Sequence, residues 1–323
     1  MNNFIKKLYA FTSSWTGTII IVLFLNFFII QSFVIPSGSM KRTELIGDFL
    51  FVKKFSYGIP IPHLPWLEIP ILPDFNKNGH LIEGSRPKRE DIVVFRYPKN
   101  KKIHYVKRCV AVGGDEILYA NKKLLIHFHE GDDYIRKYYS TKKIKKLQDK
   151  LWVENPYMEK YPGIQYAPEG MNIFEALLNY YVYHEKIDVR PVMVDGFDVP
   201  TYKLKNRTIN AFYAKVPKDH FYMIGDNRDN SNDSRFWGPV PYSFVVGTPW
   251  CIWTSIEYRS YDAVLNGDKF GSGQDHAGLK RICGDTPIDS EACEKLWNRQ
   301  RYTVRWGRVG RRIKTLEREQ PIQ

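Results

Sequence analysis

The chain has 323 residues, of which 43% are hydrophobic and 26% charged, so most of it is expected to fold around a globular core. Its formal net charge is +13. A basic chain suits an anionic lipid surface as well as a nucleic acid, so charge alone excludes neither partner. Aromatic residues make up 15% of the chain. Short β-branched and aromatic runs recur along it, which favours β structure.

The first 40 residues contain a long apolar segment. No charged residue occurs from Leu8 to Met40, and only Asn26 interrupts the apolar run of residues 19–30. About 20 such residues in a helix cross a bilayer core of roughly 30 Å, whereas the apolar part of a cleavable signal peptide has only about 7–15. We therefore expect a transmembrane anchor at residues 15–35. Positive charges flank it on both sides, so they do not settle its orientation.

Beyond the anchor, strand-like runs alternate with turn signals. The clearest lie at residues 46–52, 91–97, 103–112, 220–224 and 250–253. The interval 120–215 differs in character, because it contains a basic run and a segment with a helix-capping pattern. We expect a mainly β protein, in which an N-terminal transmembrane helix precedes an antiparallel β-sheet catalytic domain with an inserted α+β subdomain. The expected units are residues 1–14 (cytoplasmic), 15–35 (anchor), 36–119 (first half of the core), 120–215 (insertion) and 216–323 (second half and C-terminal tail).

Four cysteines are present. Cys109 and Cys251 lie in apolar runs and are expected to be buried. Cys283 and Cys293 lie in a polar segment and could form a disulfide outside the cytoplasm. A zinc site is not expected there, because His276 is the only nearby histidine and tetrahedral zinc needs four ligands.

Lys107 occupies an unusual position in the run 103–112. Strand alternation places Tyr105, Lys107 and Cys109 on one face, where Lys107 is the only charged group. Burial would lower its pKa from the ordinary value of about 10.4 and allow it to act as a general base. The alternative is a lysine that extends from a strand edge into solvent.

Two polar segments accompany this lysine. Ser37-Gly38-Ser39 follows the apolar run directly, and its hydroxyls could attack a carbonyl and stabilise an oxyanion, or simply belong to a loop. Residues 225–235 contain three Asp, three Asn, two Arg and two Ser. A calcium loop is opposed by Arg228 and Arg235 and by the missing glycine and glutamate of an EF-hand. A rigid turn held by internal ion pairs fits better.

Taken in order, three segments resemble the signature boxes of bacterial type I signal peptidases. They are Pro-Ser-Gly-Ser-Met at 36–40, Tyr-Val-Lys-Arg at 105–108 and Gly-Asp-Asn-Arg-Asp-Asn-Ser-Asn-Asp-Ser-Arg at 225–235. Gly47-Asp48 and Asp-Ile-Val-Val-Phe at 91–95 fit the same pattern, and residues 305–310 match it more weakly. The insertion matches poorly.

The resemblance implies a role for each matching residue. Ser39 would be the nucleophile and Lys107 its general base, as a Ser–Lys dyad. Ser37 and the Ser39 backbone N–H would form the oxyanion hole, and Ser231 would orient Lys107. Supporting ion pairs would come from Arg108, Asp226, Asp233 and Arg235. No metal or cofactor is implied.

Substrate pockets follow by matching positions. Family enzymes hold the end of a signal peptide as an added strand, with small residues first and third before the cut. The first pocket would be lined by Ile35, Pro36, Met40, Tyr105 and Val106, and the third by Phe33, Leu50, Val94 and Val106. The chain departs from the pattern at Arg42 and Glu44, where the family usually has proline and an apolar residue. Glu44 would lie beside the first pocket and could pair with Lys41, Arg42 or Lys53.

The implied partners are the signal peptides of exported preproteins, the lipid bilayer and, by proximity, the secretion translocon; a nucleic acid is not expected. The implied location is the bacterial cytoplasmic (inner) membrane, single-pass, with the catalytic domain on the periplasmic face. Other Ser–Lys hydrolases fit less well. Ser140-Thr-Lys-Lys143 matches the Ser-x-x-Lys motif of penicillin-recognising enzymes, but the companion motifs of those enzymes are missing. A self-cleaving repressor binds DNA, and the expected membrane span argues against it. A membrane-anchored, non-enzymatic binding protein is the remaining alternative, and it would tolerate Ser39→Ala.

Overall fold

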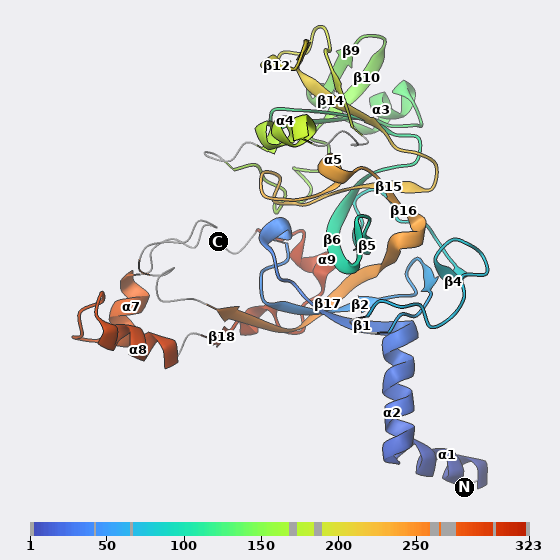
Figure 1. Ribbon diagram of the computed structural model, residues 1–323, viewed down its shortest axis with the longest axis vertical. Coiled ribbons are helices and arrows are strands. Elements are labelled where there is room, and N and C mark those ends of the chain that lie inside the picture. Colours follow the sequence, from blue (N-terminus) through green and yellow to red (C-terminus); the bar gives the residue numbers. More distant parts are fainter. Residues whose placement is uncertain are drawn as a thin grey trace.

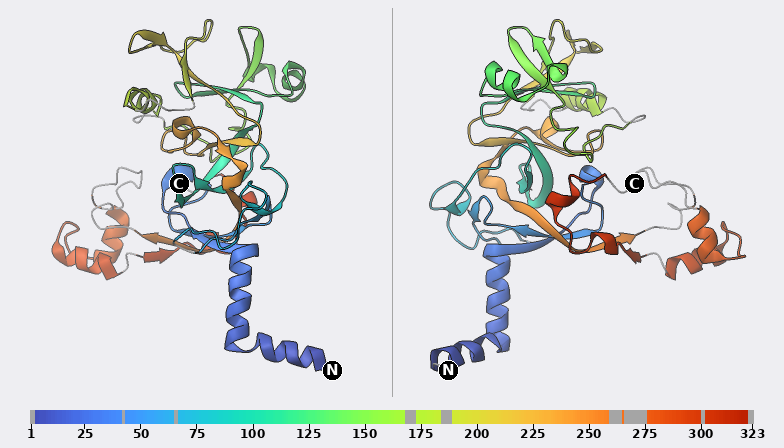
Figure 2. Two further views of the ribbon diagram at one scale, coloured as in Figure 1. Left: turned by 45° about the vertical axis from the view of Figure 1, so that its right-hand side comes forward. Right: turned by 180° about the vertical axis from the view of Figure 1, so that it is seen from behind.

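The computed structural model describes residues 3–41, 43–64, 67–167, 173–183, 189–258, 265, 276–299 and 302–320. Its strands form antiparallel sheets, which confirms the expected mainly antiparallel β architecture. A larger sheet lies in the middle of the molecule, a smaller one lies at one end, and a helical arm projects from the other end (Figure 1). The two views of Figure 2 show the same arrangement and place a C-terminal helical hairpin to one side.

The arm consists of α1 (Asn3–Thr12), α2 (Trp15–Phe24) and the π-helical turn η1 (Leu25–Ile29). Ser14 begins α2 by accepting a hydrogen bond from the Gly17 N–H, which satisfies one of the free donors of the first turn. Within the described residues, no single helix is long and apolar enough to cross a bilayer. The segments Ile5–Thr12 and Trp15–Ile29 reach that length and composition only as a pair, with a bend of 82° between them.

The helical part of the expected anchor is shorter than residues 15–35. The helix ends at Ile29, and Ile30–Val34 forms strand β1, which pairs with β2 (Asp48–Lys53). The backbone groups of β1 are satisfied by this neighbouring strand instead of by a helix. This pairing fixes the position of the Ser-Gly-Ser segment that follows.

The larger sheet has eight strands, in the order β1-β2-β17-β5-β6-β15-β16, with β18 paired to β17. Beyond β1 and β2, its strands are β5 (Ile92–Tyr97), β6 (Asn100–Val112), β15 (His220–Ile224), β16 (Val240–Pro241), β17 (Val245–Tyr258) and β18 (Tyr302–Val304). All the strand-like runs expected from the sequence fall within this sheet or overlap it. Short helical turns border it: η2 (Gly38–Met40), α5 (Ser234–Trp237), η4 (Tyr242–Phe244), η5 (Trp306–Arg308) and α9 (Ile313–Leu316).

The smaller sheet has six strands, in the order β11-β14-β7-β8-β10-β9. Five of them lie within the expected insertion, whereas β7 precedes it except for Ala120. The six strands are β7 (Glu116–Ala120), β8 (Lys123–His127), β9 (Ile144–Leu147), β10 (Lys150–Glu154), β11 (Arg190–Val192) and β14 (Ala211–Lys215). With it lie α3 (Asp132–Tyr138), η3 (Thr141–Lys143), α4 (Ile173–Tyr183) and the hairpin β12 (Tyr202–Leu204) with β13 (Arg207–Ile209). Its apolar core continues into the larger sheet through Val110, Ala111, Tyr222 and Ile224.

Two smaller features complete the fold. The proline-rich segment contributes a short strand, β3 (Gly58–Pro60), which pairs with β4 (His80–Glu83) outside the main sheets. Near the C-terminus, α7 (His276–Cys283) and α8 (Glu291–Arg299) are joined by a Cys283–Cys293 disulfide. Cys109 is a buried free thiol and Cys251 a half-buried one.

Candidate active site

The Ser-Gly-Ser segment forms the turn η2, directly after β1. Asn227 holds this turn from across the site: its backbone N–H donates to the Ser39 carbonyl (3.1 Å) and its side-chain amide to the Gly38 carbonyl (3.0 Å). Gly225 makes this approach possible. A Cβ there would lie 2.5 Å from the Ser39 carbonyl oxygen and 2.3 Å from Ser231 Oγ, so only glycine leaves room for both neighbours.

Lys107 reaches the same turn from the middle of β6. Its Nζ lies 2.7 Å from Ser39 Oγ and donates to the Val106 carbonyl at 2.9 Å. The side chain is only 3% exposed. Burial lowers the pKa of Lys107 to about 8, although the nearby carboxylates of Asp233, Glu44 and Asp226 oppose the shift. The two residues predicted as nucleophile and base are therefore in direct contact, and the amine is partly neutral near pH 8.

The two remaining predicted serines lie on either side of this pair. Ser37 Oγ is 3.5 Å from Ser39 Oγ and exposed. Ser231 is buried beside Gly225. The hydrogen bond expected between Ser231 and Lys107 is not formed in the described part of the chain. The Lys107 amine is held by the Val106 carbonyl and Ser39 instead, so the orienting contact comes from its own strand.

The expected ion pairs are present and buried. Arg108 binds both carboxylate oxygens of Asp226 at 2.8 Å, and Arg235 binds both of Asp233 at 2.8 Å. Burial alone would raise the pKa of Asp226, but Arg108 holds it below its usual value. Asp226 also accepts a hydrogen bond from the Thr43 hydroxyl at 2.7 Å. The polar turn after β15 is thereby tied to β6 and to the segment that follows the nucleophile.

Sequence reasoning missed further members of this network. Glu317 makes a second ion pair with Arg108 at 2.9 Å, and Arg308 makes one with Asp48 at 2.6 Å. Arg308 also donates to the Thr43 carbonyl. Thr43, in the turn after Ser39, is therefore hydrogen-bonded both to Asp226 and to Arg308. A signal existed for Asp48 and Arg308 in the weaker matching segments of the sequence. Nothing in the sequence marked Glu317.

The expected pocket residues separate into different groups. Phe33, Leu50, Val94 and Val106 pack together, with Ile35, in one cluster, which is the grouping expected for the third pocket. The residues expected for the first pocket are divided: Met40 packs towards Ile252 and Ile313, whereas Tyr105 lies in the cluster of Phe95 and Trp237. Pro36 is exposed. The Tyr105 ring lies 5.0 Å from Lys107 Nζ, so it still borders the dyad.

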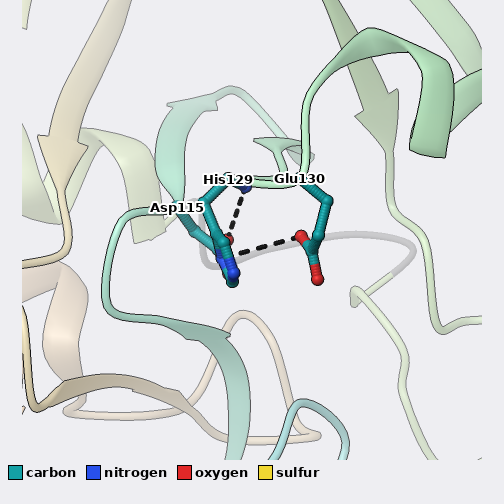
Figure 3. Close-up of side chains that lie close together, drawn as sticks. All are labelled: Asp115, His129 and Glu130. Atoms are coloured by element: carbon teal, nitrogen blue, oxygen red, sulfur yellow. Dashed lines mark hydrogen bonds and ion pairs between the residues drawn. The ribbon is translucent and has the colours of Figure 1, made fainter.

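One cluster outside this site has the composition of a metal site. Asp115, His129 and Glu130 lie close together (Figure 3), with their ligand atoms within 4.8 Å of one another. The guanidinium of Arg89 binds Asp115 at 2.7 Å and Glu130 at 2.7 Å, and lies 2.9 Å from His129 Nδ1. A cation is thus already present among these ligands, and the cluster is satisfied as an ion-pair network.

Comparisons with known proteins identify the family of the chain. The family described as "Signal peptidase, peptidase S26" matches residues 8–254. Signal peptidase I of Helicobacter pylori is 43% identical over 320 residues, covering 98% of this chain and 96% of that protein. Signal peptidase I of Pseudomonas fluorescens is 32% identical, with 77% of this chain and 73% of that protein covered.

A crystal structure of a signal peptidase I from Enterococcus faecalis is also similar, at 18% identity. It covers 51% of this chain and 97% of that one, with a TM-score of 0.24, which is too low to support an argument about fold. The family match extends over most of the chain, and the two relatives are 43% and 32% identical to it. The chain therefore belongs to the bacterial type I signal peptidases of peptidase family S26 and is a hydrolase.

Proposed function

We propose that this chain removes the signal peptides of exported preproteins, with Ser39 as nucleophile and Lys107 as general base. The observation that carries the proposal is the 2.7 Å contact between Lys107 Nζ and Ser39 Oγ. A serine hydroxyl is a weak nucleophile until a neighbouring base accepts its proton. A buried lysine whose pKa is about 8 can supply that base near neutral pH.

The chemistry follows in two halves. Neutral Lys107 accepts the proton of the Ser39 hydroxyl while Ser39 Oγ forms a bond to the scissile carbonyl carbon. The Ser37 hydroxyl and the Ser39 backbone N–H stabilise the oxyanion. Protonated Lys107 then gives its proton to the leaving amine, which leaves an ester on Ser39. A water molecule attacks that ester, Lys107 accepts the proton of the water, and release of the acid regenerates the Ser39 hydroxyl.

The substrate is the C-terminal end of a signal peptide, cut after a small-x-small sequence. Strand β1 pairs with β2 alone among the described strands, so its other edge is open to an added strand. The apolar cluster that contains Phe33 of this strand also includes Leu50 of β2 and Val94 of β5. A shallow apolar pocket favours a small side chain and leaves no room for a large one.

The same proposal includes a place in the cell. The helical arm anchors the chain in the cytoplasmic membrane, and the catalytic domain lies on its periplasmic face, near the secretion translocon. Two observations support this location. Side chains of α2 such as Val22 and Phe24 are 57% and 54% exposed, as suits contact with lipid. The Cys283–Cys293 disulfide suits an oxidising compartment.

The test is cleavage of a purified preprotein by the full chain in detergent, with the product termini read by mass spectrometry. We expect Ser39→Ala and Lys107→Ala each to lower the cleavage rate by a factor of about 10³ or more. Ser85→Ala and Lys88→Ala serve as matched controls, because both residues are exposed and their hydrogen bonds go to Ser56 and Asp91, outside the dyad. If Ser39→Ala still cut the same bond, the nucleophile would have to be another residue and the proposal would fall.

A further inference from the structure

Glu44 is an ionisable group that the proposed mechanism does not use. It lies in the turn after η2, where its backbone N–H donates to the Met40 carbonyl at 2.9 Å. The side chain is wholly buried, and neither carboxyl oxygen has a hydrogen-bond partner in the described part of the chain. Of the partners that the sequence left open, Arg42 lies outside the described residues, and neither Lys41 nor Lys53 donates to the carboxyl group.

Four charged groups on neighbouring elements act electrostatically on Glu44. Lys107 faces it from β6, Asp48 from β2, Asp226 from the turn after β15, and Arg308 from η5. Asp48 and Asp226 are already paired, with Arg308 and Arg108 respectively. Lys107 forms no ion pair with any carboxylate of the described residues. Glu44 and Lys107 are therefore an acid and a base of this buried cluster that both lack an ion-pair partner among the described residues.

The energetics of such a pair are set by burial. An isolated carboxylate inside a protein is costly, and an unpartnered one keeps its proton. Burial, together with the Asp48 and Asp226 carboxylates, raises the pKa of Glu44 to about 8. Because opposite charges stabilise each other, an ionised Glu44 favours the ammonium form of Lys107, and the two groups titrate as a pair.

We propose that Glu44 is a positioning residue that sets the pH range of the proposed base. While its carboxyl group is protonated, Glu44 leaves Lys107 free to lose a proton. Once ionised, it holds Lys107 in the inactive ammonium form and extends the acid limb of the rate profile to higher pH. The inference rests on the proposed function, because it acts through Lys107. It deepens that function by naming the residue that tunes the base.

The test is the pH dependence of kcat/KM for preprotein cleavage by the full chain in detergent. Glu44→Gln keeps the shape and removes the charge, so its acid limb should lie at lower pH by about one unit. Glu44→Asp restores an ionisable group and should return the limb towards that of the wild type. Glu44→Leu places at this position the apolar kind of residue that the resemblance implies. It should shift the limb as Gln does, and it covers the case in which Gln does not fold.

Three results would overturn the inference. One is a Glu44→Gln acid limb that coincides with that of the wild type. Another is a Glu44→Asp limb displaced as far as the Gln limb, because this would indicate a packing effect. Product termini that change while the limb stays in place would likewise overturn it, and would assign Glu44 to substrate selection.

A second measurement separates this inference from the proposed function. In a Ser39→Ala background, the reactivity of Lys107 towards acetic anhydride is followed against pH by mass spectrometry, in the protein with and without the additional Glu44→Gln substitution. A lower half-reaction pH after the substitution supports the coupling without any catalysis. If labelling shifts and the kcat/KM limb does not, Glu44 and Lys107 are coupled but Lys107 is not the base, so the proposed function fails and the inference that rests on it fails as well. If neither shifts, the coupling itself is wrong.

Discussion

The two sheets of this molecule differ in what they bury. The six-stranded sheet of the insertion packs apolar side chains, such as Leu125, Phe174 and Phe212, with little buried charge. The eight-stranded sheet instead surrounds a group of buried charges beside Ser39: Glu44, Asp48, Lys107, Arg108, Asp226, Asp233, Arg235 and Arg308. Apolar burial stabilises a fold, whereas buried ion pairs contribute little net stability and are strongly disruptive when one partner is lost.

This contrast indicates that the two sheets contribute differently to stability and to catalysis. The core of the insertion is apolar. At its border with the larger sheet, Gln165 hydrogen-bonds to the 225–235 turn and the Tyr161 ring lies against Arg108. The buried charges of the larger sheet lie around the turn η2 and Lys107. In our proposal they position this turn and set the charge of that lysine. A mutation in the first region should therefore change stability without changing the pH profile, whereas a mutation in the second should change both stability and catalysis.

The largest expected effect comes from Arg108→Ala. This change leaves the Asp226 and Glu317 carboxylates buried without their cation, and we expect it to destabilise the protein by about 3–5 kcal/mol. Cleavage should also be lost, because Asp226 is part of the turn that holds Ser39. The matched control is Arg136→Ala in the insertion, whose pair with Asp133 is exposed and which should change stability by less than about 0.5 kcal/mol. The free energy of unfolding of both variants is measured with a denaturant in detergent. Similar decreases for the two would contradict the expected difference between buried and exposed ion pairs.

Leu125→Ala tests the insertion. Leu125 is completely buried in the apolar core beside β7 and β10, so its truncation should cost about 2–5 kcal/mol. The pH profile and the cleavage site should stay as in the wild type at a temperature where the variant is folded. If the acid limb of the pH profile were displaced, the core of the insertion would influence the pKa of the proposed base. That result would contradict the expected difference between the two sheets.

A smaller and more local effect is expected from Cys283→Ser. The disulfide closes a short loop with a sequence separation of 10, and its loss should weaken the α7–α8 hairpin by about 2–3 kcal/mol. Hydrogen exchange should rise in this hairpin alone, while the preprotein is cut at the wild-type rate. A global fall in protection, or a loss of cleavage, would show that the hairpin is coupled to the sheets.

Local pattern was enough to predict much of the site. Strand alternation indicated that Lys107 faces an apolar layer, and the Ser-Gly-Ser segment and the 225–235 turn were recognisable as short motifs. The structure brings these three parts together. The ion pairs of Arg108 with Asp226 and of Asp233 with Arg235 were also expected from matching positions, and the structure contains both.

The features that could not be predicted depend on contacts between residues far apart in the sequence, or on a hydrophobic pattern that fits more than one kind of secondary structure. Glu317 meets Arg108 across 209 positions of the chain, and no local feature marks such a contact. The end of the apolar N-terminal run was expected to be helical, but residues 30–34 form β1, because an apolar run without periodicity does not distinguish a helix from a strand. The burial of Glu44 could not be read from its neighbours either, since charged residues precede it in the sequence.

The most direct test of the account is the pH dependence of kcat/KM for the wild-type enzyme between about pH 6 and pH 10. The pKa of Lys107 is lowered to about 8 by burial, and only the neutral amine can accept the Ser39 proton. The rate should therefore rise with pH and reach half of its maximum near pH 8, and Lys107→Arg should be inactive throughout, since an arginine stays protonated. A flat profile, or an active Lys107→Arg variant, would contradict the claim that a neutral Lys107 is the base.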